Sequence, residues 1–161
     1  MKICEPNRIT HSYEQTIEGS IEEIFPLYCP VKEALWTEGW DPNVVYSESG
    51  VVEPECVFIT EENGLASAWF VAVYDIEQGC VEMIKHTPAI TISKLKIIVE
   101  PISEKTTRAL ISYSITSLSS SGDDGLKEFT KENFDISMDA WEKAMNHYLK
   151  TGKMLTGLPK F

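Results

Sequence analysis

The sequence predicts an α+β fold in which a curved, seven-stranded antiparallel sheet wraps around one long C-terminal helix. Three observations lead to this prediction. Apolar and polar residues alternate over residues 44–118, which is the period of β-strands. Short turns separate these runs and favour antiparallel pairing of consecutive strands. Large apolar residues then recur at helical spacing over residues 124–150, enough for a helix of roughly 40 Å.

The N-terminal part predicts one strand and the start of a helix. Residues 1–10 contain Pro6 and show no period, so we expect an N-terminal arm there. Residues 11–18 alternate and predict a strand. Ser20 and Glu23 have the spacing of a capping box, which indicates that a short helix begins directly after Ser20.

Pro30 separates this short helix from a second one, expected over residues 31–36, because the residue before a proline avoids helical geometry. The alternating region then divides into six strands at turns rich in Gly, Pro and Asn. The expected strands cover residues 44–48, 56–60, 66–74, 80–86, 90–100 and 108–118.

The last helix is expected as one continuous element over residues 124–150. Asp123 or Asp124 can cap its start, and Gly152 suits its end. We therefore expect one domain over residues 11–152, followed by a C-terminal tail over residues 153–161.

Composition excludes several classes of protein. The 161 residues carry a formal charge of −11, which disfavours nucleic-acid binding because phosphate backbones repel an acidic surface. No apolar run is long enough for a membrane span, and residues 1–7 lack the apolar core of a signal peptide. We expect a cytoplasmic protein. The cysteines are expected to be reduced: Cys4, Cys29, Cys56 and Cys80.

No motif predicts a metal or a cofactor. His11, His86 and His147 lie far apart in the sequence, and no Cys-x-x-Cys pair occurs. The nucleophile-elbow and P-loop patterns are also missing. We expect neither a metal site nor a cofactor.

A sheet that curves around one helix seldom meets it everywhere, so we expect a cavity between them. Large side chains of the helix, the sheet and the segment before the second strand are candidates to contact a ligand there. The same residues could instead simply pack the core. The candidates are Trp36, Trp40, Trp69, Tyr113, Phe134, Met138, Trp141 and Met145.

Three residues are weak candidates for catalysis. Glu33 lies near two tryptophans, where burial would raise the pKa of its carboxyl and suit it to act as a general base. Tyr113 lies among the isoleucines of its strand, and a buried hydroxyl needs a partner such as a ligand carbonyl. His86 could join Tyr113 as an acid–base pair if it faced the cavity. The strand pattern does not decide which face His86 occupies.

Several segments are similar to a known superfamily. Residues 25–33 read FPLYCPVKE, Trp36 and residues 39–41 follow, and residues 146–149 read NHYL near the end of the last helix. With the order of elements, residues 11–152 resemble the START-like, Bet v 1-like helix-grip superfamily, also labelled SRPBCC. The closest resemblance is to a bacterial and archaeal branch that has no agreed activity.

The resemblance implies a hydrophobic cavity for a lipid, a polyketide or a similar small molecule. An alternative is a polyketide cyclase/dehydratase-like enzyme that uses the same cavity. Another alternative is a co-chaperone-like interaction domain, which would use the outer sheet face or the acidic surface. The expected partner is a small hydrophobic molecule, and a homodimer is possible. The glycine-rich loop of the pollen-allergen branch is absent, since residues 50–54 read GVVEP.

Overall fold

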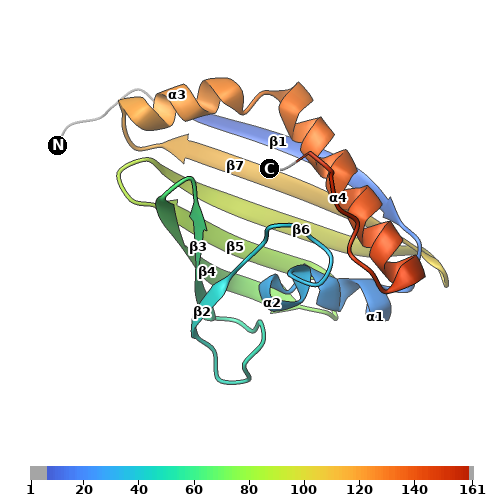
Figure 1. Cartoon of the computed structure of the whole chain (residues 1–161). Coiled ribbons are helices and arrows are strands. Elements are labelled where there is room, and N and C mark those ends of the chain that lie inside the picture. Colours follow the sequence, from blue (N-terminus) through green and yellow to red (C-terminus); the bar gives the residue numbers. More distant parts are fainter. Residues whose placement is uncertain (1–6, 160–161) are drawn as a thin grey trace.

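The computed structural model describes residues 7–159. One strand and three short helical segments come first: β1 (Arg8–Ile17), α1 (Ile21–Ile24), the 3₁₀ helix η1 (Phe25–Tyr28) and α2 (Pro30–Glu33). Six strands follow: β2 (Asn43–Tyr46), β3 (Val57–Glu62), β4 (Leu65–Asp75), β5 (Cys80–Thr87), β6 (Thr91–Ser103) and β7 (Thr106–Ser117). Two helices complete the fold, α3 (Ser120–Glu128) and α4 (Lys131–Thr151) (Figure 1).

The strands form one antiparallel sheet of seven in the order β1-β7-β6-β5-β4-β3-β2. Consecutive strands pair from β2 to β7, as short turns require. The chain then brings its first strand beside its last, so β1 and β2 are the two edges. The predicted α+β, helix-grip architecture is confirmed.

The first strand begins earlier than residue 11, where the alternation suggested that it starts. Arg8 already pairs with Thr116, and the Arg8 Nε donates to the Thr116 hydroxyl at 2.7 Å. Side-chain hydroxyls also pair between β1 and β7: the Oγ atoms of Ser12 and Ser112 lie 2.6 Å apart. Residues 8–10 therefore belong to the sheet and not to a loose arm. Cys4 and Pro6 lie outside the described residues.

The prediction of one continuous helix over residues 124–150 is wrong. α3 ends at Glu128, and Phe129 leaves helical geometry with φ −79° and ψ 59°. Thr130 then caps a new helix, since its Oγ1 accepts from the Asn133 N–H at 3.2 Å. A threonine side chain that bonds to nearby backbone competes with the helical hydrogen bonds, so the chain turns here and α4 takes a new direction (Figure 1).

Helix α4 packs on the inner face of the sheet beside β1 (Figure 1). Its apolar stripe is buried at Phe134, Met138 and Met145. Two polar contacts fix its position. The buried Gln15 side chain donates to the Met138 carbonyl at 2.8 Å, and the Asn146 side chain bonds both to the Thr16 carbonyl, at 3.1 Å, and to the Glu18 N–H, at 2.8 Å.

The C-terminal tail turns back onto the domain after Gly152, which adopts a left-handed conformation at φ 67°. The Gly157 N–H donates to the Glu38 carboxylate at 2.8 Å. Leu158 packs against the hydrophobic core. The described part of the tail therefore covers residues near α2 and the loop that follows it.

Candidate functional site

The inner face of the sheet has a covered end and a partly exposed end. Along β7 the inward residues Thr107, Ala109 and Ile111 are buried, whereas Tyr113, Ile115 and Ser117 keep part of their surface accessible. Strand β1 shows the same change, from buried Ile17 and Gln15 to partly exposed inward residues nearer Arg8. α4 covers one end of this face and leaves the other incompletely covered.

Glu33 is a carboxylate held inside the covered part. It ends α2, and Pro30 at the start of that short helix fixes where it lies. The Trp141 Nε1 of α4 donates to Glu33 Oε1 at 3.1 Å. The buried Thr37 hydroxyl lies near the carboxylate without reaching good hydrogen-bond geometry, and it also favours the charged form. Burial outweighs both neighbours and raises the pKa of Glu33 to about 8.

Two tyrosines lie close enough to Glu33 to feel its charge. Burial raises the pKa of the Tyr28 hydroxyl, and the charges of Glu142 and Glu33 raise it further. Burial and the Glu33 charge act in the same direction on the pKa of Tyr113. Tyr113 lies at the boundary between the covered and the partly exposed end, with its ring edge-on to Phe134 at 6.2 Å between centroids. Neutral hydroxyls and a protonatable carboxyl therefore share one region.

A second aromatic cluster lies at the β3–β4 side of the sheet. The rings of Phe58 and Trp69 stack at 5.4 Å, and Trp40 meets both edge-on at 6.3 and 6.0 Å. The Trp69 indole donates to the Thr60 hydroxyl at 2.9 Å, and the Trp40 indole donates to the Pro30 carbonyl at 2.8 Å. These two hydrogen bonds fix both indoles on the inner face.

The structure shows which residues of β5 face inward, a point that the sequence pattern did not decide. His86 is exposed and pairs with Ala68 and Ile92 on the outer face, so it does not join Tyr113. Lys85 faces inward instead, between Trp69 of β4 and Ser93 of β6. Its Nζ lies 5.3 Å from the centre of the Trp69 ring. Sequence reasoning missed Lys85 as a candidate, although its alternation with the apolar Val81 and Met83 was the available signal.

The predicted ligand-contacting residues fall into two groups. Trp36, Phe134, Met138, Met145 and Trp69 are 0–4% exposed and belong to the packed core. Three members are partly exposed: Trp40, Tyr113 and Trp141.

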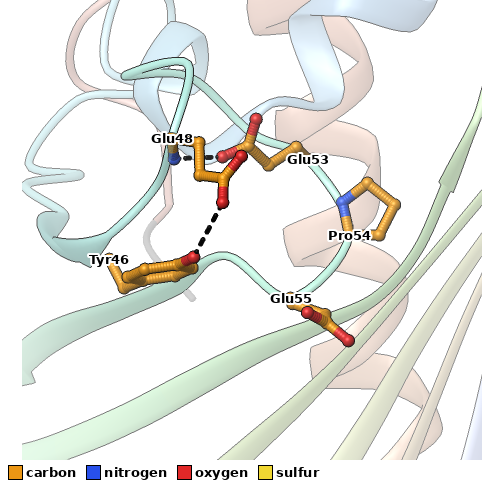
Figure 2. A pocket seen from close by; sticks show the side chains of 5 residues that line it. All are labelled: Tyr46, Glu48, Glu53, Pro54 and Glu55. Atoms are coloured by element: carbon orange, nitrogen blue, oxygen red, sulfur yellow. Dashed lines mark hydrogen bonds between the residues drawn. The ribbon is translucent and has the colours of Figure 1, made fainter.

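The expected cavity between sheet and helix is not among the best-formed hollows of residues 7–159. Both of these hollows open to solvent elsewhere. The first, of about 240 Å³, lies in the β2–β3 loop and is lined by Tyr46, three glutamates and Pro54 (Figure 2). The Tyr46 hydroxyl donates there to Glu48 at 3.2 Å, and the Glu48 N–H donates to Glu53. The second, of about 260 Å³, lies on the outer face around Arg108.

The outer face is where a co-chaperone-like domain would hold a partner. It carries paired charges, since Lys96 lies 2.8 Å from Glu82 and Arg108 lies 2.6 Å from Glu100. In the part of the chain that the structure describes, no cluster of three His, Cys, Asp or Glu side chains could hold a metal ion. No helix there is long and apolar enough to cross a membrane. Cys29, Cys56 and Cys80 are free thiols.

Comparison with known proteins gives the fold. No protein-family model matches the sequence, and no curated protein matches it either. Among solved structures, a hypothetical protein from Helicobacter pylori is 13% identical with a TM-score of 0.69, covering 87% of each chain. Norcoclaurine synthase from Thalictrum flavum is 10% identical with a TM-score of 0.67, covering 91% of this chain and 88% of that chain. Ara h 8.0201 is 12% identical with a TM-score of 0.64, covering 90% of this chain and 99% of that chain.

These likenesses establish a Bet v 1-like, helix-grip fold at low sequence identity. One fold carries many activities, so the fold alone does not give the function. The function depends on the residues of the site.

Proposed function

We propose that this chain binds a small, largely apolar molecule between the sheet and α4, at the partly exposed end of the inner face. The observation that carries the proposal is the change in burial along β7, where Tyr113, Ile115 and Ser117 stay accessible although they face inward. An inward face that the protein's own helices leave uncovered offers apolar surface to a ligand. The α3–α4 turn borders this end, because Phe129 contacts His11 of β1 at 5.1 Å between ring centroids.

The ligand fits best if it carries one hydrogen-bonding group on an apolar body, as lipids and polyketides do. Tyr113 lies at the boundary of the exposed end, close enough to the covered Glu33–Trp141 pair to feel the Glu33 charge, and its hydroxyl can orient such a group. This proposal groups the chain with the small-molecule binders of the helix-grip superfamily. It requires no metal or cofactor.

An enzyme of the cyclase/dehydratase type is the second candidate, and Glu33 is the observation that favours it. A carboxyl whose pKa is raised to about 8 by burial can give and take a proton near neutral pH. Tyr113, whose neutral form burial favours, could donate to a carbonyl oxygen in the same region. His86 is not part of this candidate site because it faces outward.

The binding proposal is tested by uptake of the fluorophore N-phenyl-1-naphthylamine and by native mass spectrometry of protein purified from its own host. Ile115→Asn places an amide on the inner face, and we expect about tenfold or more weaker uptake, because the ligand loses one apolar contact surface. Leu110→Asn is the matched control, because Leu110 is 42% exposed on the outer face of the same strand.

Equal affinity of both variants, or no uptake by the unmodified protein, contradicts the proposal. Tyr113→Phe then tests orientation. We expect it to weaken binding of a carbonyl ligand and to leave binding of a plain hydrocarbon unchanged.

A further inference from the structure

Lys85 is a charged group on the inner face that the binding proposal leaves unexplained. Its inward position follows from its pairing with Trp69 and Ser93, which are 4% and 5% exposed. Among the residues that the structure describes, Lys85 has neither an ion pair nor a hydrogen bond. Its one specific contact is with the Trp69 ring, at 5.3 Å. On the outer face, by contrast, Lys94 and Lys96 both pair with Glu82, at 3.7 and 2.8 Å.

A half-buried ammonium without a carboxylate partner costs folding free energy, so its retention needs a reason other than stability. The side chains that flank Lys85 on the neighbouring strands, Trp69 and Ser93, are neutral. Burial lowers the pKa of Lys85, and the charge of Glu62 on β3 opposes this only in part. The neighbouring carboxylates instead raise the pKa of Lys96, Lys127 and Lys143.

We propose that Lys85 forms a reversible imine with an aldehyde or ketone whose apolar body lies on the inner face. The proposal rests on the proposed function, since the carbonyl compound has to occupy the binding surface described above. The Lys85 Nζ lies over the Trp69 ring, and the partly exposed Trp40 offers a flat apolar surface in the same cluster.

The chemistry needs no other reagent. The neutral Lys85 amine attacks the carbonyl carbon, so a C–N bond forms and the carbonyl electron pair moves to oxygen, which takes one of the two amine protons. The hydroxyl of the resulting carbinolamine then leaves as water with the remaining N–H proton, and the nitrogen electron pair forms the C=N bond. One amine and one carbonyl compound give one imine and one water, without oxidation or reduction.

Charge favours a neutral carbonyl compound over an anion. A carboxylate ligand could also pair with Lys85, yet the chain carries a net charge of −11, and Glu62 lies near the lysine. Both disfavour the approach of an anion, whereas an uncharged aldehyde meets no such repulsion.

The test is reductive trapping with 2-naphthaldehyde and sodium cyanoborohydride, followed by peptide mapping in a mass spectrometer. At limiting aldehyde and near-neutral pH we expect Lys85 to carry most of the naphthylmethyl adduct found on lysine side chains. Each unit by which its pKa lies below that of a surface lysine gives about tenfold more free amine. Lys85→Arg should lose this adduct, and Lys105→Arg, at an exposed lysine, should keep it.

A binding arm separates this inference from the proposed function. 2-Naphthalenemethanol has the same apolar body without a carbonyl, and it should displace N-phenyl-1-naphthylamine from the unmodified protein and from Lys105→Arg alike. Displacement without a Lys85 adduct overturns the imine and leaves the binding proposal standing. Failure of displacement overturns the binding proposal itself. Labelling spread evenly over the lysines also overturns the inference.

Discussion

The Glu33 carboxyl lies in surroundings that favour its neutral form, with one indole N–H from Trp141 as its well-formed hydrogen bond. In the unfolded chain this group has an ordinary pKa near 4.5, and in the folded protein burial raises it to about 8. The folded state therefore binds the proton more tightly. Glu33 therefore makes its full contribution to the free energy of unfolding below pH 4.5. This contribution is lost as the pH rises toward 8.

Glu33→Gln should remove this decline. The amide oxygen can still accept from Trp141, and it does not titrate. We expect the unmodified protein to lose stability between pH 5 and pH 8, on the order of a few kcal/mol relative to Glu33→Gln. Urea unfolding at several pH values measures the difference. Glu22→Gln, at an exposed glutamate of α1, is the control and should follow the unmodified protein. A pH dependence that Glu33→Gln leaves unchanged would show that Glu33 titrates normally.

At this scale the sequence predicted part of the candidate site. The raised pKa of Glu33 was foreseeable, because a carboxylate among tryptophans in a short helical segment tends to be buried. The sequence did not predict which of Lys85 and His86 faces inward. Strand alternation places neighbouring residues on opposite faces, but it does not say which face is inward where both carry a polar residue. Only the pairing with Trp69 and Ser93 settles the side of Lys85.

Among the elements, α3 depends on close packing against the turn that precedes β6. A Cβ added at Gly122 would lie 2.2 Å from the Ile90 carbonyl oxygen, which is backbone and cannot easily move. Gly125 lies in the same helix, and a Cβ there would meet nothing within 4 Å. The two glycines therefore have different roles, although the sequence spacing makes them look alike.

Alanine substitutions at these two positions should act in opposite directions. Gly122→Ala has to displace α3 from the sheet, and we expect a loss of about 1–3 kcal/mol in the free energy of unfolding. Gly125→Ala should stabilise the protein by up to about 1 kcal/mol, because alanine favours the helix more than glycine does. Thermal and urea unfolding measure both. Destabilisation by Gly125→Ala, or a neutral Gly122→Ala, would contradict the packing of α3.

The strands were predictable from their period, whereas the break between α3 and α4 was not. Phe129 and Phe134 continue a stripe that one helix could also carry, since apolar residues spaced by three to five fit either case. The five-residue step between them and the capping ability of Thr130 were the available signals. Neither signal is strong enough by itself to predict the end of a helix. The sheet decides the outcome, because Phe129 packs on His11 of β1 and the His11 Nε2 donates a hydrogen bond to the Phe129 carbonyl at 2.9 Å.

Across the whole molecule, acidic residues outnumber basic ones, 25 to 14, and the formal charge is −11. The ion pairs on the described surface join partly or well exposed side chains, so each contributes little to stability. Long-range repulsion among the excess carboxylates opposes the compact state.

We therefore expect salt to stabilise this protein. The melting temperature should rise as sodium chloride increases from about 20 to about 300 mM, because the screening length falls from tens of ångströms to below about 10 Å. Scanning calorimetry at pH 7.5 measures it. Sodium sulfate would confuse the result through its own effect on burial, so chloride is the proper salt. A melting temperature that falls with chloride would mean that the surface ion pairs dominate.

The Asn146 side chain has a consequence for how this protein meets other copies of itself. A carboxamide offers one acceptor and one donor, as a peptide unit does, and here it saturates the backbone at the end of an edge strand. An incoming polypeptide that tried to extend the sheet at this point would find those groups already taken. One helix side chain thus occupies the backbone groups at this end of β1, which disfavours the addition of another strand there.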